Sequence, residues 1–335
     1  MAHTAKVLTI AVAAYNVAPY IAQCLDSFVD EKLLPALDIV VIDDGSTDAT
    51  ARIVRKYINR FPESFRLVSQ ENGGYGAAVN HALALAQGEY FKTVDGDDWV
   101  DTKELLTVVC YLMDNRERSD VVVTDYCWVR HRDGKEIRRI KTDFAQKQYQ
   151  HIYSFDEIAD KVYLNMHAVT IRTALLQSHN IQLDEHCFYE DQEYILYPIP
   201  YCTSITFSPI PLYQYRLGRS GQSVDIKMMI KRHDQHLRVL NALFDYNNVH
   251  GSLQTYKKLY LERGIAEAVD DEYQIFLAKG NDEKNIEQMK AFDLKLREEH
   301  PGVYAACSRK SVWLLRKTQF KLFPMAAWVY SRLRG

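Results

Sequence analysis

The sequence predicts an α/β fold in which a mostly parallel sheet is flanked by helices and followed by a helical C-terminal region. Between residues 7 and 101, short apolar runs alternate with segments of helical periodicity, which is the order of successive βαβ units. The runs carry Val and Ile on both faces, as strands buried in a parallel sheet do. Beyond Asp225 the helical pattern is almost continuous.

Composition and charge exclude several classes of protein. Of the 335 residues, 47% are hydrophobic and 25% charged, which is typical of a globular chain with one large domain or two of moderate size. No apolar run approaches the roughly 18 residues that a membrane-spanning helix needs. The net charge of −3 gives no global electrostatic attraction to nucleic acid, so we expect no nucleic-acid partner.

The first part of the chain is expected to alternate strands and helices. The expected strands are 7–14, 38–43, 65–69 and 89–94, and the helices are 18–29, 51–58 and 77–86. The first strand follows Lys6 and ends in small residues, so a secretory signal is an alternative, but its short length and β-branched residues favour a strand. Gly45 marks the turn after the second strand, where Ser46 or Thr47 can cap the next helix.

Later elements have weaker signals. We expect a strand over 121–129, a hairpin or loop over 130–150, a helix over 155–176 and a strand over 205–215. Pro209 and Pro211 interrupt the last of these, which predicts an edge strand because proline lacks a ladder donor. His167 and His233 have no partner that the sequence identifies, and we interpret both as structural.

Six cysteines are spread along the chain without any C-x-x-C pair. This spacing indicates neither a disulfide framework nor a structural zinc site. We therefore expect a reducing, cytoplasmic setting.

Acidic clusters follow the second and fourth strands, and ligands of parallel sheets bind beyond the carboxyl ends of the strands. Asp95-Gly96-Asp97 places two carboxylates two residues apart, and the glycine lets the backbone turn sharply. Hard carboxylate oxygens suit Mn²⁺ or Mg²⁺ together with substrate phosphates. The sequence favours a diphosphate site here over the alternative of an acidic surface turn.

Two further segments suit a nucleotide. Asp44 ends the second apolar run and can offer its carboxylate to a nucleobase N–H or a ribose hydroxyl, or can cap the following helix. The segment 72–80 is glycine-rich and enters a helix, so backbone N–H groups around Gly74 can approach a phosphate. It lacks the spacing and position of a dinucleotide-binding fingerprint.

The order of these motifs resembles glycosyltransferase family 2. The motifs are Ala13-Ala14-Tyr15-Asn16, Asp43 to Asp48, Asn72 to Asn80, and Ala86 to Asp98, and the resemblance covers about residues 7–101. It implies the A-type glycosyltransferase fold, a Rossmann-like and mostly parallel sheet. It also implies transfer of a sugar from a nucleotide-diphosphate donor with inversion.

The resemblance gives roles to individual residues and to regions. Tyr15 and Asp44 would lie against the base and ribose, Asp95 would face the donor, Asp97 with Asp95 would ligate the metal, and Ala13 would contact the donor through its main chain. A catalytic domain is expected over 1–225, with a nucleotide-sugar half at 1–110 and an acceptor half at 111–225. A helical region with a basic, aromatic tail is expected over 226–335.

The segment Phe188 to Glu193 resembles the acceptor-side acidic motif of the same family. An inverting transfer needs one carboxylate to take the proton of the acceptor hydroxyl. The resemblance makes Asp191 this base, with Glu190 as the alternative. An ordinary acidic helix start also fits, whereas a zinc site built from His186 and Cys187 fits poorly.

The segment Tyr215 to Ser223 resembles the part of the family that closes over the donor phosphates. Arginine offers phosphate a bidentate fork, so Arg216 and Arg219 are candidates for the leaving group. Pairing of one of them with a surface acid is the alternative.

The tail reverses the charge of the chain. Residues 309–335 hold seven basic residues and no acidic one, whereas the preceding 308 hold 34 basic against 44 acidic. Aromatic and aliphatic residues lie between the basic ones, which suits contact with an anionic membrane surface. A terminal helix that packs on the rest of the chain is the alternative.

These residues are relevant to three possible functions. The leading one is an inverting, metal-dependent hexosyltransferase that uses a nucleotide-sugar donor, expected to be a UDP-sugar. Its acceptor is expected to be a glycan or a lipid-linked acceptor in cell-surface polysaccharide biosynthesis. A non-catalytic sugar-nucleotide-binding or glycan-binding partner subunit has no need of Asp191. A sugar nucleotidyltransferase would need a basic, glycine-rich loop after the first strand, where Tyr15 to Pro19 stands.

Overall fold

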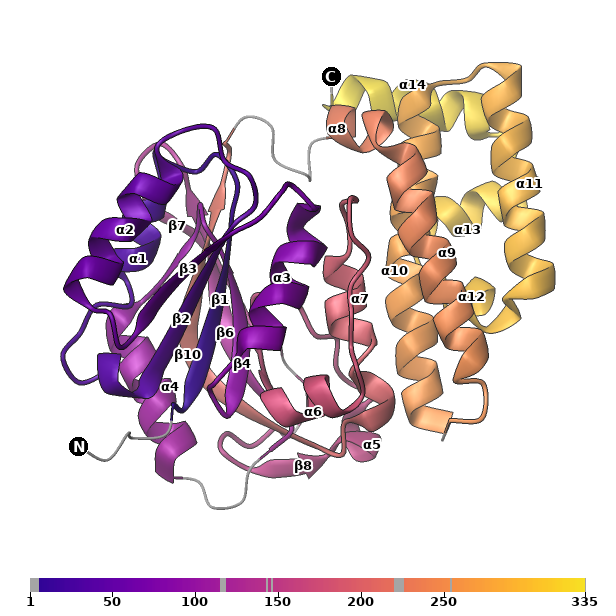
Figure 1. The fold of residues 1–335 in the computed structure, drawn as a ribbon. Coiled ribbons are helices and arrows are strands. Elements are labelled where there is room, and N and C mark those ends of the chain that lie inside the picture. Colours follow the sequence, from indigo (N-terminus) through magenta and orange to yellow (C-terminus); the bar gives the residue numbers. More distant parts are fainter. Residues whose placement is uncertain are drawn as a thin grey trace. The chain divides into compact units, whose positions relative to one another are not determined.

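A computed structural model of the protein describes residues 6–114, 119–142, 144–145, 147–219, 226–253 and 255–334. The chain forms two compact units, Met1–Arg219 and Ser220–Gly335. The first unit is built around a β-sheet, and the second consists of helices (Figure 1).

The central sheet of the first unit has the strand order β3-β2-β1-β4-β9-β6-β10-β5, with β7 paired to β6 and β8 to β10. Its strands are β1 (Leu8–Ala14), β2 (Leu37–Asp43), β3 (Phe65–Ser69), β4 (Tyr90–Asp95), β5 (Trp99–Val100), β6 (Val121–Arg130), β7 (Glu136–Ile140), β8 (Ile152–Ser154), β9 (Val169–Arg172) and β10 (Ser204–Leu217). The neighbours β3, β2, β1 and β4 are parallel, whereas β9 runs antiparallel to both of its neighbours. The predicted α/β fold is confirmed, with a parallel first half and a mixed second half.

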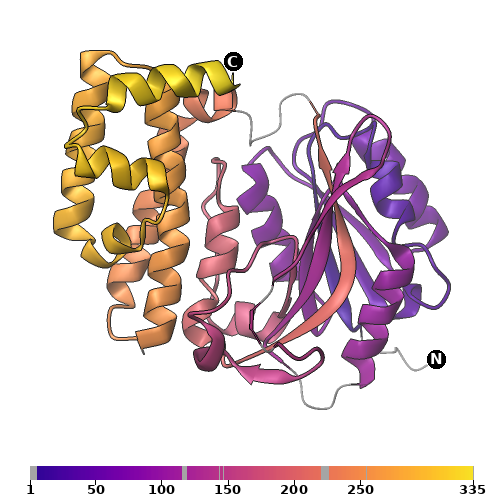
Figure 2. The same cartoon turned by 180° about the vertical axis from the view of Figure 1, so that it is seen from behind.

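Helices cover both faces of this sheet. They are α1 (Ile21–Asp26), α2 (Thr50–Arg60), α3 (Gly74–Leu85), α4 (Thr102–Asp114), α5 (Phe155–Ile158), α6 (Thr173–Ser178) and α7 (Asp191–Leu196). In Figure 1, α1 and α2 lie on one side of the sheet and α3 on the other; Figure 2 shows the same arrangement from behind. Every residue of β2 is buried between these layers, which explains its continuous apolar run.

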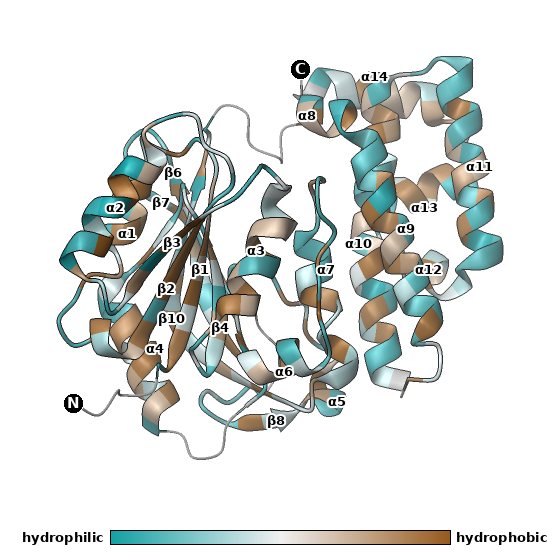
Figure 3. Cartoon of the chain, in the orientation of Figure 1, coloured by the Kyte–Doolittle hydropathy of each residue, from teal (hydrophilic) through white to brown (hydrophobic). Residues whose placement is uncertain are grey.

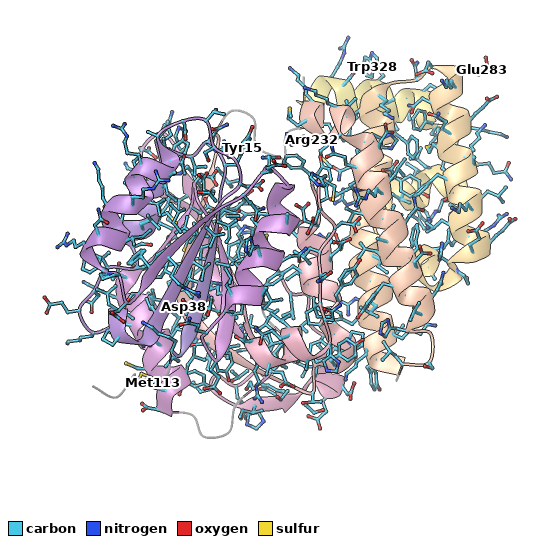
Figure 4. All side chains as sticks on the ribbon, in the orientation of Figure 1. Tyr15, Asp38, Met113, Arg232, Glu283 and Trp328 are labelled. Carbon is cyan, nitrogen blue, oxygen red and sulfur yellow. The ribbon has the colours of Figure 1, made fainter. Side chains whose placement is uncertain are left out.

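The carboxyl ends of the parallel strands meet at one edge of the sheet. Ala13 pairs with both Ile42 and Asp95, and Asp43 pairs with Ser69, so the ends of these strands lie in register. The loops that carry the predicted motifs therefore start from the same edge. Figure 4 shows Tyr15 at this carboxyl edge and Asp38 toward the opposite, amino edge.

The helix predicted over 155–176 was wrong. This segment contains only the short helix α5, then strand β9 and the start of α6. Val169 to Ile171 is β-branched and lies buried between β4 and β6, so tertiary pairing overrides the apolar spacing. A four-residue strand is too short to show its own periodicity.

The edge position predicted for the proline-containing strand was also wrong. β10 pairs with β6 along its length, and β8 and β5 pair with its other side at its two ends. Its register shifts occur between Ser208 and Pro211 and between Pro211 and Tyr213. The prolines thus mark a bulge inside the sheet, the other place where a strand tolerates them.

The cap of α2 differs from the prediction of Ser46 or Thr47. Ala49 occupies the N-cap position and makes no side-chain capping hydrogen bond. Asp48, one residue earlier, accepts a hydrogen bond through its carboxylate from the backbone N–H of Thr50, at 2.9 Å. Ser46 instead accepts a hydrogen bond from the N–H of Asn16, at 3.0 Å.

All regular secondary structure among the described residues of the second unit is helical, as predicted for the region beyond Asp225. It contains α8 (Ile226–Lys231), α9 (His233–Val249), α10 (Thr255–Lys279), α11 (Glu283–Glu299), α12 (Pro301–Ala306), α13 (Lys310–Lys317) and α14 (Phe323–Arg334). Helix α10 packs against α8, α9, α11, α12 and α14, and the outer turns of α11 are mostly hydrophilic (Figure 3).

His233, for which the sequence indicated no partner, forms a hydrogen bond with the buried Glu272. Glu272 also forms a hydrogen bond with His236, at 2.8 Å. In the part of the chain that the structure describes, no helix has both the length and the apolarity needed to cross a membrane.

Candidate functional site

Loops from the carboxyl ends of β1 and β2 are bound tightly to each other. Asn16, in a left-handed conformation at φ 52°, accepts hydrogen bonds through Oδ1 from the N–H groups of Thr47 (2.9 Å) and Asp48 (3.3 Å). The neighbouring Tyr15 stays 52% exposed, as an aromatic surface for a ligand requires. Asn16 belongs to one of the sequence motifs, but the motif predicted no role for its side chain.

The carboxylate of Asp44 holds the entrance to α3. Asp44 is buried and accepts hydrogen bonds from the N–H groups of Gly73 (2.8 Å) and Gly74 (2.9 Å) and from Gln70 Nε2 (2.8 Å). Gly74 needs to be glycine because its φ is +87°. The backbone donors expected for a phosphate are thus engaged by Asp44, whose carboxylate keeps room for a further donor because it has about four acceptor positions.

Asp95 ends β4 with one carboxylate oxygen unsatisfied. Its Oδ1 is buried and accepts no hydrogen bond from any residue that the structure describes. Burial raises the pKa of Asp95 to about 7, and the negative charges of Asp97 and Asp191 act in the same direction. The next residue, Gly96, donates its N–H to the Ala13 carbonyl at 3.0 Å, so Ala13 meets the acidic loop through its main chain.

Asp97 is paired with an arginine. Its Oδ2 lies 2.6 Å from Nη2 of Arg219, whose side chain is 30% exposed. The charge of Arg219 also opposes the rise in the pKa of Asp95. Residues 220–223, the rest of the segment predicted to close over phosphates, lie outside the described residues.

Arg216 and Asp98 form the support beneath this cluster. The buried Asp98 accepts hydrogen bonds from the Tyr213 hydroxyl (2.8 Å) and from the Arg216 N–H (2.7 Å). The Arg216 guanidinium donates to the Asp97 carbonyl (2.7 Å) and to Gln23 Oε1 (2.8 Å), and it is only 6% exposed. Of the two predicted arginines, Arg219 is therefore the one whose charge faces the carboxylates.

The acceptor-side motif contributes two carboxylates in different surroundings. Glu190 is 2% exposed and accepts a hydrogen bond from the Gly76 N–H at 3.0 Å, inside the first turn of α3. Burial raises the pKa of Glu190 to about 8, and the charge of Asp191 adds to this effect. Asp191 is the first residue of α7 and is only partly buried. The structure thus brings Asp95, Asp97 and Asp191 together.

His167 lies beside the same cluster, a position that the sequence did not indicate. A ring nitrogen of His167 and carboxylate oxygens of Asp95 and Asp98 lie within 4.8 Å of one another. Burial lowers the pKa of His167 to about 3, and Lys92 adds to this effect, so the ring is neutral. His186 and Cys187 do not belong to this group, which is the one cluster of possible metal ligands among the described residues.

An open cavity of about 470 Å³ lies at the entrance to α3, where two of its lining residues, Gln70 and Gly73, donate hydrogen bonds to the Asp44 carboxylate. It is lined by residues 70–73 after β3, by Ala77, Asn80 and His81 of α3, and by Glu185 and His186. Asn80 Nδ2 donates to the Leu183 carbonyl at 2.9 Å, which fixes the far wall to the helix. The cavity is large enough for part of a nucleotide.

Comparison with known proteins identifies sequences and folds similar to this chain. The model of Glycosyl transferase family 2 matches residues 9–177. The putative glycosyltransferase EpsH of Bacillus subtilis is 25% identical over 256 residues, which cover 75% of this chain and 72% of EpsH. Other curated relatives, such as the chondroitin synthase of Pasteurella multocida, are matched over less than half of their length, 14% in that case.

Solved structures share the fold. S. aureus TarS 1–349 in complex with UDP-GlcNAc superposes with a TM-score of 0.65 at 19% identity, over 97% of this chain and 92% of that one. The mannosyltransferase PcManGT from Pyrobaculum calidifontis, in complex with GDP-Man and Mn²⁺, gives a TM-score of 0.52 at 18% identity, over 97% and 86%. Since the family model spans half of the chain and starts within β1, the protein belongs to glycosyltransferase family 2.

Proposed function

We propose that the protein is an inverting glycosyltransferase that uses a nucleoside-diphosphate sugar, with a UDP-sugar as the donor. The observation that carries the proposal is the buried Oδ1 of Asp95, which has no hydrogen-bond partner among the residues that the structure describes, beside the charges of Asp97 and Asp191. An unsatisfied carboxylate oxygen destabilises a fold, so its presence at the ligand-binding edge of the sheet indicates a ligand that completes it.

A divalent cation fits this acidic cluster. Asp95 supplies a hard oxygen ligand within 4.8 Å of the neutral ring of His167, which can add a nitrogen. Both oxygens of Asp98, the third residue of that cluster, already accept hydrogen bonds, so we assign the second carboxylate to Asp97 on the same loop. Mn²⁺ or Mg²⁺ bound there would stabilise the negative charge of the leaving diphosphate. The Mn²⁺ bound by PcManGT supports this assignment at the level of the fold.

The donor nucleotide is assigned to the loops after β1, β2 and β3. Tyr15 offers its exposed ring to the base, and Asp44 has an acceptor position left for a base N–H or a ribose hydroxyl. Arg219, paired with Asp97 at 2.6 Å, can turn its fork to the diphosphate when a cation takes over the carboxylate. Arg216 lies beneath this cluster and donates a hydrogen bond to the Asp97 carbonyl, which supports the loop that carries Asp97.

Asp191 is the proposed base. The acceptor hydroxyl oxygen forms a bond to the anomeric carbon, its proton passes to the Asp191 carboxylate, and the bond from the anomeric carbon to the diphosphate breaks. Glu190 suits this role less well, because burial with a pKa of about 8 keeps it largely protonated near neutral pH. Its hydrogen bond to Gly76 makes it a support for α3.

The acceptor is proposed to be a growing glycan or a lipid-linked glycan of a cell-surface polysaccharide. The relatives named chondroitin synthase, together with TarS bound to UDP-GlcNAc, support a hexosyl donor and a polymeric acceptor. We place the reaction on the cytoplasmic side, in keeping with the spacing of the cysteines.

A calorimetric titration tests the donor site. The purified chain is titrated with UDP, GDP, CDP and TDP, each with and without Mn²⁺. We expect UDP to bind, and Mn²⁺ to tighten its binding at least tenfold, because a cation held by the carboxylates would attract the negatively charged diphosphate.

Two aspartates provide a matched pair of variants. Asp97→Asn should lose the Mn²⁺ effect, whereas Asp114→Asn, an exposed residue at the end of α4, should keep it. Binding of another nucleotide in place of UDP would change the donor class. If none of the four binds with or without Mn²⁺, the proposed donor site is wrong.

A further inference from the structure

The last two helices carry apolar residues on both faces. On their inner faces, Val312, Leu315, Phe323 and Ala327 are at most 3% exposed. On their outer faces, the exposed apolar residues are Trp313 (56%), Leu314 (42%), Met325 (56%), Trp328 (55%) and Val329 (41%). A helix on the surface of a globular protein normally turns charged and polar residues outward, so the fold of this unit leaves the outer set unexplained.

Packing and ion pairs hold these helices in place. Arg316 donates through Nε to Asp293 of α11 at 2.7 Å and lies over the Tyr304 ring, 3.7 Å from its centre. Helix α14 packs along α10, where the Tyr330 hydroxyl donates to Gln274 at 3.4 Å. The outer apolar residues are therefore presented by a fixed scaffold.

The exposed charges that α13, α14 and the turn between them contribute have one sign. Exposed basic residues surround the apolar ones: Lys310 and Lys317 on α13, Lys321 between the helices, and Arg332 on α14. Lys317 Nζ lies 4.6 Å from the Trp313 ring centre, and the Arg332 guanidinium 4.2 Å from that of Trp328. No acidic residue occurs in residues 309–335.

The structure also removes two residues from the basic set that the sequence indicated. Arg309 pairs with Asp271 at 3.0 Å, and Arg316 pairs with Asp293. Carboxylates of the helical unit therefore balance the charges of both arginines. The charges that remain outside are those interleaved with the two tryptophans. In Figure 2, α13 and α14 both lie on the near side of the helical unit, and Figure 4 shows Trp328 on the outer side of α14.

We propose that the outer surface of α13 and α14, formed by these five apolar and four basic residues, docks on an anionic lipid bilayer. Tryptophan prefers the interface between headgroups and acyl chains, and the flanking Lys and Arg side chains attract anionic headgroups. The apolar residues enter the interfacial layer without spanning it. This proposal does not depend on the proposed transferase activity.

A second copy of the chain suits this surface less well. A symmetric dimer through the same face would bring Lys310, Lys317, Lys321 and Arg332 of both copies into one interface, and like charges across an interface are unfavourable. An anionic bilayer meets both the charge and the apolar residues at once.

Vesicle binding tests the proposal with the full chain. The protein is sedimented with phosphatidylcholine vesicles that do or do not contain phosphatidylglycerol, at low and at physiological salt. We expect binding only to the anionic vesicles, weakened by salt, with a blue shift of tryptophan fluorescence on binding.

Two charge-matched variants distinguish a specific surface from general attraction. Replacing Lys310, Lys317, Lys321 and Arg332 by Gln should weaken binding at least tenfold. The same change at Lys284, Lys290, Lys295 and Arg297, exposed residues on α11, should leave binding within twofold. Trp328→Ser should weaken binding and reduce the fluorescence shift, with Trp313 giving the remainder, while UDP titration stays unchanged.

Three outcomes would overturn the proposal. Equal losses in the two charge variants would show attraction without a defined surface. Absence of binding to anionic vesicles at low salt would exclude a bilayer as the partner. Concentration-dependent dimerisation that Trp328→Ser abolishes, without vesicle binding, would assign the surface to a second copy.

Discussion

The two edges of the central sheet hold buried carboxylates in opposite surroundings. At the amino edge, Asp38 accepts hydrogen bonds from the Thr9 hydroxyl, the Arg66 guanidinium and the Gln87 N–H, with an ion pair of 2.7 Å to Arg66. At the carboxyl edge, Asp95 leaves Oδ1 without a partner among the described residues, and its pKa is raised to about 7. At the amino edge an aspartate completes a hydrogen-bond network within the fold. At the carboxyl edge an aspartate keeps an acceptor oxygen available for a ligand.

This difference predicts opposite effects of the same substitution. A carboxylate with complete partners stabilises the fold, and its removal leaves the partners uncompensated. A carboxylate held beside other negative charges destabilises the ligand-free protein, and binding of a ligand offsets this loss of stability. Neutral variants should therefore harm stability at the amino edge and harm function at the carboxyl edge.

The largest effect is expected at Asp191. Asp191→Asn should reduce sugar transfer by about 10³-fold, because the amide cannot take the proton of the acceptor hydroxyl. Release of nucleoside diphosphate in the presence of acceptor measures the rate. Binding of UDP and thermal unfolding should change little, since Asp191 is only partly buried.

Glu190→Gln serves as the matched control for this experiment. It keeps a carbonyl oxygen for the Gly76 N–H and should retain much of the activity. If instead Asp191→Asn stays active and Glu190→Gln loses transfer, the two residues exchange roles.

The next effect concerns the amino edge. Asp38→Asn should lower the free energy of unfolding by about 3 kcal/mol, because it leaves the Arg66 charge without its buried partner. Urea unfolding followed by circular dichroism measures the loss, with Asp114→Asn as an exposed control. The folded variant should bind UDP as the parent does, and a loss of binding at unchanged stability would contradict the division between the two edges.

A third effect depends on pH and concerns Glu190. Its pKa is raised to about 8 from an ordinary value near 4.5, so the folded state resists its ionisation and loses stability as pH rises through this range. Glu190→Gln should match the parent near pH 4 and exceed its free energy of unfolding by about 2 kcal/mol at pH 6. Urea unfolding at several pH values gives both curves; a constant difference would show that Glu190 does not titrate in this range.

Local signals made the parallel half of the fold predictable. Buried apolar runs, turn glycines and helical spacing each lie within a few residues of one another, as in β2, the Gly45 turn and α2. Strand β9 was missed because only its pairing with β4 and β6 makes Val169 to Ile171 a strand. The prolines of β10 were misplaced for the same reason, since their bulge is defined by the partner strand.

The candidate site was predictable to a similar extent. Asp44, Asp95 and Asp97 stand in motifs, and the strand order places them at one edge. The roles of Asp98 and His167 depend on contacts with β10 and its neighbours more than 40 residues away, which no spacing in the sequence reveals. The sequence likewise could not show that Arg216 is buried and Arg219 faces Asp97.

The smallest effect tests the carboxyl edge directly, at Asp95. In protein freed of metal at pH 8, Asp95→Asn should raise the midpoint of thermal unfolding by about 2–4 °C, because it removes a charge that burial and Asp97 disfavour. The gain should shrink toward pH 5, where the parent is mostly protonated, since a raised carboxyl pKa lowers stability only as pH rises through it. Added Mn²⁺ should then raise the midpoint of the parent but not that of the variant, reversing their order. If Asp95→Asn lowers the midpoint at pH 8 as Asp38→Asn does, the Asp95 carboxylate is satisfied within the fold and the contrast between the two edges fails.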